Sequence, residues 1–246
     1  MFLFEACYDL DELARNNMHI HTSFSRCAKP EMTVENILRE AERAGLRAIA
    51  LTDHSPAEGS YALQVQALRR QVAQAQSPVK VYVGAELSAY GVGKYSETPE
   101  TEALLDYRLF SHNHYHQDFW EHPEERTPEG YKQHALAVLR ALFASGRADC
   151  IAHPLFGRFL DICEDRTEIP RAISDTELGE LMQEGTRAQV AWEINSGAVM
   201  GDPIFYRRYF QIGREAGAVF LFGTDTHRLA GIDPYKQLPV LKQILY

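Results

Sequence analysis

Histidines and carboxylates follow most of the predicted strands, and side chains of these two kinds can bind a metal ion together. His19 and His21 flank Ile20 in the segment MHIH. Because alternate residues of a strand point to the same side, both imidazoles would face one way and Ile20 the other. Neutral imidazole nitrogens are common metal ligands. The segment therefore predicts a site in which His19 and His21 hold a metal ion together.

The same pattern recurs along the chain, because nearly every predicted strand ends in a histidine or a carboxylate. The polar residues at these strand ends are His19 and His21, Asp53 and His54, Glu86, His112, His153, Glu193 and Asn195, and Asp225 and His227. They include six of the ten histidines of the chain. The carboxyl ends of parallel strands meet at one face of a barrel or open sheet, where active sites form. We therefore expect these side chains to converge into a metal-binding cluster.

The chain that carries these residues alternates between strand-like and helix-like segments. The predicted strands are 18–21, 47–54, 79–87, 104–112, 148–154, 188–195 and 218–227. The predicted helices are 33–45, 60–76, 128–146, 174–185, 203–217 and 235–245, with a Ser174–Glu177 capping box in the fourth. Seven strands separated mostly by helices indicate a parallel α/β sheet with crossover helices. No composition shift marks a linker, so we expect one domain over residues 1–246.

Composition narrows the class of protein. The chain has 246 residues, of which 45% are hydrophobic, and a net charge of 25 − 34 = −9. An acidic chain is a poor non-specific nucleic-acid binder, because phosphate contacts need clustered Lys and Arg. The sequence contains no run of about 18 apolar residues, so we expect no membrane span. The first residues lack the basic region of a signal peptide, and the four cysteines lack C-x-x-C spacing. We therefore expect a cytoplasmic protein.

Six motifs carry a resemblance to a known family. They are HIH at 19–21, TDH at 52–54, GAE at 84–86, SH at 111–112, AHP at 152–154 and TDTH at 224–227. With these motifs in this order, the chain resembles the PHP superfamily, the polymerase and histidinol phosphatase family of metal-dependent phosphoesterases. The resemblance runs from about Asn17 to His227. It implies a distorted seven-stranded (β/α)7 TIM-like barrel, with the metal site at the C-terminal ends of the strands.

The resemblance also implies three groups of metal ligands. The groups are a first site of His19, His21, Glu86 and Asp225, a second of Glu86, His112 and His153, and a third of His54, His227 and one residue shortly after the first two histidines. Cys27 lies where some members have that last ligand. Two interpretations stay open, namely that the Cys27 thiolate replaces it or that the third metal is absent. The implied cofactors are two or three divalent ions of zinc, manganese or iron.

The expected catalytic roles follow from this cluster. Glu86, as the shared ligand, would fix the spacing of the metals, and His227 would protonate a poor leaving group. Arg26, Arg158 and Arg228 each follow a ligand motif closely. A guanidinium at any of these positions could hold substrate phosphate in a bidentate grip. The alternative is that each is a solvated surface arginine.

Three strand-end residues have supporting roles in this hypothesis. We expect Asp53 to accept the free N–H of a ligand imidazole rather than to bind metal itself. Glu193 and Asn195 either act at the metal site or end a buried strand with hydrogen bonds to loops.

Two polar loops, 112–130 and 155–173, are candidate covers of the metal face. Long loops after barrel strands often have this role. In the first loop, His114 or His116 would reach the substrate. The alternative for both segments is an ordinary surface loop.

A paired metal site of this kind suits the hydrolysis of phosphate esters. We expect a phosphomonoesterase that acts on a small phosphorylated metabolite, since the chain is acidic and shows no separate nucleic-acid module. The alternatives are a phosphodiesterase or nucleotide-directed hydrolase, a non-catalytic metal-binding domain, and an amidohydrolase on a related barrel. The expected partner is thus a small phosphorylated substrate, with no membrane, and nucleic acid is disfavoured.

Overall fold

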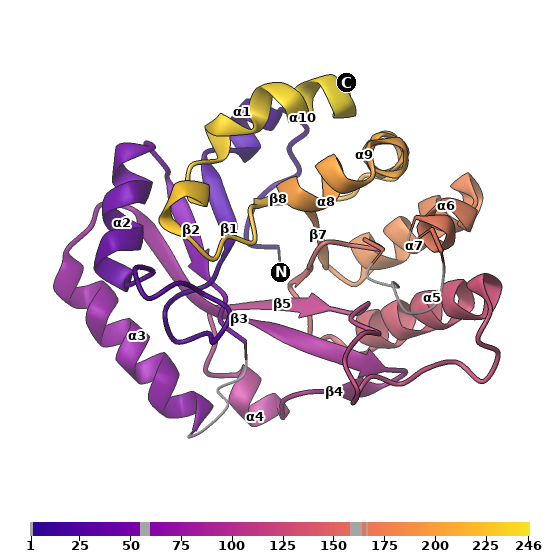
Figure 1. The fold of residues 1–246 in the computed structure, drawn as a ribbon, viewed down its shortest axis with the longest axis horizontal. Coiled ribbons are helices and arrows are strands. Elements are labelled where there is room, and N and C mark those ends of the chain that lie inside the picture. Colours follow the sequence, from indigo (N-terminus) through magenta and orange to yellow (C-terminus); the bar gives the residue numbers. More distant parts are fainter. Residues whose placement is uncertain (1, 55–59, 158–163, 166) are drawn as a thin grey trace.

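A parallel sheet curved into a nearly closed barrel forms the centre of the molecule (Figure 1). The computed structural model describes residues 2–54, 60–157, 164–165 and 167–246. Its strands are β1 (Asn16–Ile20), β2 (Ala48–Leu51), β3 (Lys80–Gly91), β4 (Lys94–Tyr95), β5 (Tyr107–Ser111), β6 (Cys150–Ile151), β7 (Ala191–Asn195) and β8 (Phe220–Gly223). Seven strands follow the order β1-β2-β3-β5-β6-β7-β8 with parallel neighbours, and β4 pairs antiparallel with β3. The seven-stranded α/β barrel predicted from the sequence is confirmed.

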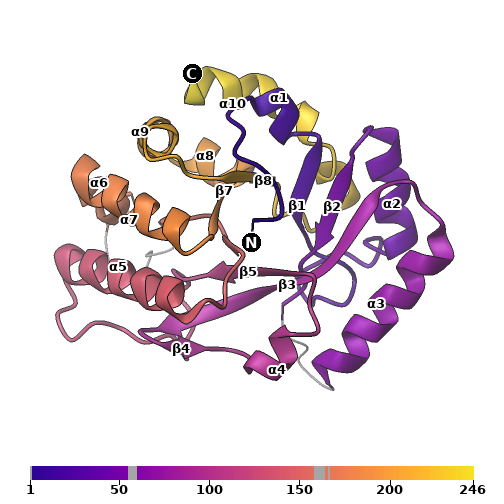
Figure 2. The same cartoon turned by 180° about the vertical axis from the view of Figure 1, so that it is seen from behind.

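The two edges of the sheet meet next to the first histidine pair. The backbone N–H of His21 donates to the carbonyl of Thr226 at 3.0 Å, and Ile20 forms a parallel bridge with Thr226. Figure 2, seen from behind, shows β1 and β8 side by side at this closure. The first and last motifs of the chain are therefore neighbours in space, as convergence at one barrel face requires.

Helices cover the outside of the barrel. They are α1 (Leu10–Leu13), α2 (Val34–Arg43), α3 (Tyr61–Ala75), α4 (Pro99–Glu102), α5 (Pro128–Ser145), α6 (Glu168–Ala172), α7 (Asp175–Arg187), α8 (Ser196–Gly201), α9 (Pro203–Glu215) and α10 (Leu238–Leu245). The predicted capping box is present, since Ser174 accepts from the Glu177 N–H and the Glu177 carboxylate accepts from the Ser174 N–H. Within the described ranges, no helix combines the length and apolar character that a bilayer crossing needs.

The predicted elements differ from the structure at their ends, and two of these differences have a clear local cause. The strand predicted over 148–154 contains only Cys150–Ile151, because the backbone of His153 turns into the left-handed region at φ 31°. The helix predicted over 235–245 begins at Leu238, since Pro234–Lys236 form a separate 3₁₀ turn. Both differences fall at element ends, where local turn geometry overrides hydrophobic pattern.

Apolar side chains fill two layers on opposite sides of the sheet. The larger layer lies between the strands and the helices and includes Ile20, Leu51, Phe110, Trp192 and Phe222. The smaller one lies on the other face of the strands and includes Met18, Ala48, Ala50, Tyr107 and Ala152. Ile20 therefore packs in the larger layer while its two histidine neighbours face the site, as the HIH pattern predicts.

Candidate metal centre

Four potential ligand atoms converge near the ends of β1 and β8 and the middle of β3. They are Nε2 of His19, Nε2 of His21, Oε2 of Glu86 and Oδ1 of Asp225. Five of the six distances that join these atoms are 3.1–3.4 Å. Four ligands at 2.0–2.1 Å in a tetrahedron lie about 3.3 Å from one another. We call these residues the first ligand set, and their spacing is that of a tetrahedral metal site.

The first ligand set brings imidazoles and carboxylates together in a buried site, and each kind of group shifts the pKa of the other. Burial alone would lower the pKa of His21, but hydrogen bonds with Asp225 and Glu86 outweigh it and raise this pKa to about 9. Burial would raise the pKa of Glu86, yet the charges of His54 and His19 hold it well below its usual value. The same opposition lowers the pKa of Asp225, where His19 and His21 outweigh burial. Protons shared in this way occupy positions that a bound cation would take.

A second ligand set consists of Glu86, His114 and His153. Nε2 of His153 lies 3.1 Å from Oε1 of Glu86, whereas Oε2 of Glu86 faces the first ligand set. The two carboxylate oxygens of Glu86 therefore point to two different sets, which is the arrangement of a bridging ligand. The rings of His114 and His153 are stacked, with centroids 5.1 Å apart.

His112 does not join either set, although the sequence predicts it as a ligand. Its ring is fully buried, and no described residue forms a hydrogen bond with either ring nitrogen. Burial and then the charge of His153 lower its pKa to about 3, so the ring is neutral. His112 directly follows β5, whereas His114 lies two residues further, on the loop that reaches the cavity. The geometry thus places His114 where the sequence prediction has His112.

A third ligand set lies beside the first and contains His21, Cys27, His54 and His227. Nδ1 of His227 donates to the carbonyl of Asp225 at 2.8 Å, which leaves Nε2 as the nitrogen available for a ligand. Partial burial raises the pKa of the Cys27 thiol, and the carboxylates of Glu86 and Asp225 raise it further. Of the two sequence interpretations of Cys27, the structure is compatible with ligation.

Glu193 connects the first two sets. Its Oε1 lies 2.8 Å from Nδ1 of His19, and its Oε2 accepts from the backbone N–H of His153. A carboxylate at Nδ1 keeps the proton on that nitrogen and turns the Nε2 lone pair toward the ligand set. Gly223 makes room for this contact, because a Cβ there would overlap the Glu193 carboxylate and lie 2.8 Å from Cβ of His19.

Asp53 reaches a ligand imidazole through a hydroxyl group, and Asn195 ends its strand as a helix cap. Asp53 accepts from the N–H and hydroxyl of Thr22 and from the hydroxyl of Ser25, at 2.6–2.7 Å. The Ser25 oxygen is in turn 3.4 Å from Nδ1 of His21. The expected direct contact between Asp53 and an imidazole is therefore replaced by one through a hydroxyl. Asn195 caps α8 by accepting from the Ala198 N–H.

Two ligand candidates have unusual backbone angles. His153 and Asp225 lie at φ 31° and 50°, in the left-handed region that non-glycine residues rarely adopt. At His153, the bond from its N–H to Glu193 helps to hold this conformation. Strain of this kind persists where the surroundings over-determine it, and it is concentrated at functional sites.

Comparison with known families identifies this arrangement. The model of the PHP domain family matches residues 17–177, which is more than half of the chain and includes five of the six motifs. The chain belongs to the PHP domain family. Membership makes it a domain of the metal-dependent hydrolase type, with His, Glu and Asp clusters that could hold the metal. A search of curated proteins found no match.

Solved structures found by comparison share little sequence with this PHP domain and superpose on it only partly. A deoxyribose phosphate aldolase from Aeropyrum pernix is 14% identical over 94% of both chains, with a TM-score of 0.44. The catalytic domain of a mannanase from Streptomyces sp. SirexAA-E is 13% identical over 93% of this chain and 72% of that chain, with a TM-score of 0.44. Likenesses at this level carry no argument about function.

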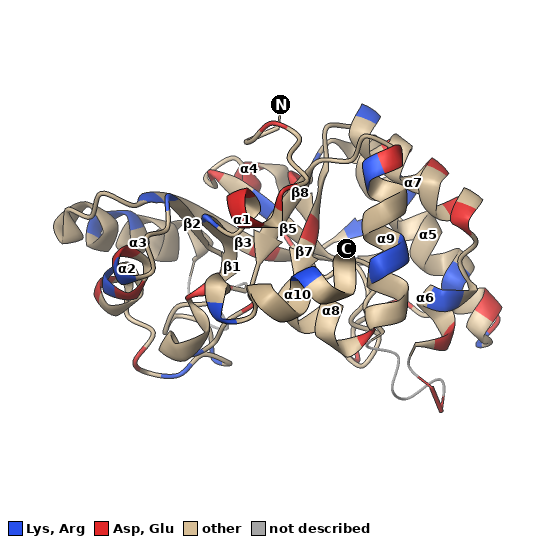
Figure 3. Ribbon diagram, turned by 90° about the horizontal axis from the view of Figure 1, so that it is seen from above, with Lys and Arg blue, Asp and Glu red and all other residues tan. Residues whose placement is uncertain are grey.

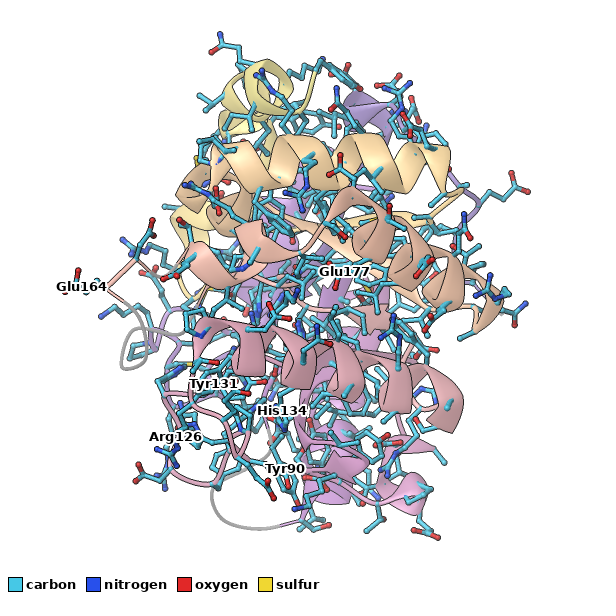
Figure 4. The ribbon with its side chains drawn as sticks, turned by 90° about the vertical axis from the view of Figure 1, so that its right-hand side faces the viewer. Tyr90, Arg126, Tyr131, His134, Glu164 and Glu177 are labelled. Atoms are coloured by element: carbon cyan, nitrogen blue, oxygen red, sulfur yellow. The ribbon has the colours of Figure 1, made fainter. Side chains whose placement is uncertain are left out.

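A cavity of about 590 Å³ opens onto all three ligand sets of the PHP domain. Its lining includes Glu86, His114, His153, Asp225, Cys27, His54 and His227. The loop after β5 covers one side, contributing His116, Gln117, Phe119 and Trp120. Figure 4 labels Arg126 of this loop together with Tyr131 and His134 of α5, and Arg126 and Tyr131 line one pocket. The candidate cover over 112–130 therefore lies at the metal face.

The predicted phosphate-binding arginines that the structure describes do not line the cavity. Arg26 is exposed and is not among the residues that line the cavity. Arg228 is also exposed and lines a neighbouring pocket of about 380 Å³ with Asp225 and His227. Arg158 and part of the predicted loop 155–173 lie outside the described residues.

Proposed function

We propose that this PHP domain is a phosphoesterase that hydrolyses a small phosphorylated metabolite, as a phosphomonoesterase, with two or three divalent metal ions. The observation that carries the proposal is the position of Glu86, whose two carboxylate oxygens face two separate ligand sets. When bound, paired divalent cations supply a nucleophile from water at neutral pH and neutralise charge that develops on phosphoryl oxygens. Zinc, manganese and iron all suit ligand sets of imidazole and carboxylate.

The residues of the chain have distinct tasks in this proposal. Glu86 sets the separation of the first two ligand sets. Glu193 retains a proton on Nδ1 of His19 and positions the backbone of His153. His227 lies at the cavity with Nδ1 bonded to the Asp225 carbonyl, so in a protein with two bound metals, whose third ligand set holds no cation, its Nε2 is a candidate to hold the proton that the leaving group takes up.

The charge of the cavity supports dependence on metal. Among the described residues that line it, none is lysine or arginine. A phosphate ester bound there would therefore meet imidazoles and carboxylates, and cations at the ligand sets would provide the compensating charge. Arg228, in the adjoining pocket, remains the candidate of this chain for an outer phosphate contact.

The size and surface of the molecule favour a small substrate over a polymer. The volume of about 590 Å³ falls within the range of small-molecule sites. Lysine and arginine are interspersed with aspartate and glutamate over the helices in Figure 3, and the net charge is −9. A nucleic-acid track would need clustered positive charge.

The test is phosphate release by metal-depleted protein to which zinc or manganese is restored. The substrates are para-nitrophenyl phosphate and bis(para-nitrophenyl) phosphate, assayed in parallel. We expect metal-restored turnover of the monoester, and loss of both turnover and bound metal in Glu86→Gln. Turnover of the diester alone would replace the phosphomonoesterase by a phosphodiesterase, and metal binding without turnover of any ester would favour a non-catalytic domain.

The matched control for Glu86→Gln is Glu102→Gln. Glu102 is a second buried glutamate, paired with Arg147 on the outside of the barrel and absent from the ligand sets. Its substitution is expected to lower stability while leaving metal content and turnover per folded molecule unchanged.

A further inference from the structure

Two tyrosine–histidine pairs join the loop after β5 to α5, and they run in opposite senses. The loop supplies the tyrosine of the first pair, in which the hydroxyl of Tyr115 lies 2.7 Å from Nδ1 of His134. The loop supplies the histidine of the second pair, in which Nδ1 of His122 lies 2.6 Å from the hydroxyl of Tyr131. Tyr131 and His134, both labelled in Figure 4, are three residues apart on α5, so the two pairs meet one face of this helix.

We propose that these two pairs position His114 so that it completes the second ligand set with Glu86 and His153. A ligand on a regular strand is placed by the sheet, but a ligand on an irregular loop needs support from its surroundings. His114 directly precedes Tyr115, so a shift of Tyr115 away from α5 also moves the backbone of His114. The inference rests on the proposed metal-dependent function and deepens it, because the affinity for the second cation then depends on contacts with α5.

Both imidazoles of the pairs can accept a hydrogen bond from their tyrosine. Burial lowers the pKa of His134, and burial followed by the charge of Arg126 lowers the pKa of His122, so both rings are neutral at neutral pH. The Glu121 carboxylate lies 3.9 Å from Nε2 of His134, which favours the proton on that nitrogen and leaves Nδ1 as the acceptor. The hydroxyl of the tyrosine is then the donor.

Packing supports the same placement of the loop. Tyr115 and Tyr131 are buried, and their rings meet edge to face with centroids 5.1 Å apart. They form a small apolar cluster with Trp120 and Ile169. The ring of Trp120, which belongs to the loop, lies 5.5 Å from the ring of His114. The loop therefore buries aromatic surface against α5 and contacts the ligand imidazole with the same group of side chains.

Two further hydrogen bonds hold the loop independently of α5. The side-chain amide of Asn113 donates to the carbonyl of Phe156, and the backbone N–H of Glu121 donates to the carbonyl of Tyr90 at 2.7 Å. Loss of one tyrosine–histidine pair is therefore expected to loosen the loop without releasing it, so that single variants remain folded.

The experiment is a titration of the metal-depleted full chain with Zn²⁺ in competition with a chromogenic chelator, which resolves the binding equivalents. His114→Ala identifies the equivalent that uses His114. We expect Tyr115→Phe and Tyr131→Phe each to weaken that equivalent by up to about 5-fold, since a fall of the correctly placed fraction to about one fifth raises the apparent dissociation constant about 5-fold. The double variant should weaken it more than either single change. The other equivalents should keep their affinities, which also reports that the variants are folded.

Two matched variants separate positioning from stability. Tyr95→Phe removes a hydroxyl that donates to the carbonyl of Ala141 in α5 at 3.1 Å, but from β4 rather than from the loop. It should lower the melting temperature and leave every zinc affinity unchanged. His134→Asn keeps an acceptor oxygen near the position of Nδ1, so it should retain the affinity that His134→Leu loses.

Unchanged affinity of the His114-dependent equivalent in the double variant would overturn the proposal. Equal weakening of all equivalents, or a full complement of zinc in His114→Ala, would overturn it as well. These readouts are binding constants and need no substrate. A protein that shows the expected pattern and hydrolyses no ester would contradict the hydrolase proposal alone.

Discussion

Replacement of Glu193 by glutamine tests whether the ligand sets depend on an orienting carboxylate. Glu193 is buried and touches two groups, Nδ1 of His19 through Oε1 and the backbone N–H of His153 through Oε2. Glutamine keeps the shape of this side chain but has only one acceptor oxygen. The backbone N–H of His153 can only donate, so the amide oxygen is expected to turn toward it.

The amide NH₂ then faces Nδ1 of His19. That contact favours the tautomer in which Nδ1 accepts and Nε2 carries the proton, which puts a hydrogen in the position that a metal would take. Loss of an outer partner of a ligand histidine typically weakens metal binding 10–100-fold. This corresponds to about 1.4–2.7 kcal/mol, which agrees with the loss of one hydrogen bond to a charged group at about 1.5–3 kcal/mol.

The assay is competition for zinc between the protein and a chromogenic chelator, with the ¹⁵N shifts of His19 as the tautomer readout. Glu102→Gln carries the same substitution at a buried glutamate outside the ligand sets, and it should leave zinc affinity unchanged. Glu193→Gln with wild-type zinc affinity would refute the orienting role. Weakened binding with an unchanged His19 tautomer would show that Glu193 supports zinc binding by some route other than the tautomer of His19.

Three further predictions follow from the geometry. His114→Ala should remove one bound metal equivalent, while His112→Asn should leave metal stoichiometry unchanged; elemental analysis of both variants distinguishes the structural assignment from the sequence one. Gly223→Ala should displace the Glu193 carboxylate and weaken zinc binding about as much as Glu193→Gln, by about 10–100-fold in the chelator assay. The third concerns pH: His21 gains stability from a pKa raised from 6.5 to about 9, so this contribution is complete below 6.5 and is lost as the pH rises through 9. The melting temperature of the metal-free protein should therefore fall between these pH values, and a flat or rising profile would contradict the folded-state interactions of His21.

The sequence is sufficient to predict the barrel because each level of its pattern agrees. Short apolar strands, helices with caps such as Ser174, and polar residues at the strand ends all indicate the same α/β topology. The parts that differ are the ends of elements and the short elements that the pattern does not predict, namely β4, α1, α4, α6 and α8. The turn at His153 shortens β6, and its cause is a hydrogen bond to Glu193, forty residues away in the chain. A contact between residues so far apart in the sequence leaves no pattern in the residues around His153 from which it could be predicted.

The candidate site can be predicted where ligands lie on strands or directly after them. His19, His21, Glu86 and Asp225 converge as expected, because the parallel strands that carry or precede them lead to one face of the barrel. The strand-end pattern misses His114 as a candidate ligand because this residue lies on an irregular loop, although its spacing from His112 repeats that of His19 and His21. The role of Glu193 cannot be decided from the sequence. A glutamate that orients a metal ligand and a glutamate that merely ends a buried strand occupy the same kind of position in the sequence pattern.

The ligand sets share members, so their occupancies should be coupled. Glu86 faces two of the sets, and His21 lies between the first set and the rings of His54 and His227. In the metal-free protein, the raised pKa of His21 and the lowered pKa of Glu86 show that protons and carboxylates balance one another within the buried cluster. A first cation that displaces the protons of His19 and His21 replaces their two positive charges by its own two, so the net charge of the cluster is unchanged, and it fixes the orientation of Glu86. The cost of orienting the second set is then already met, so binding of the first metal is expected to favour the second.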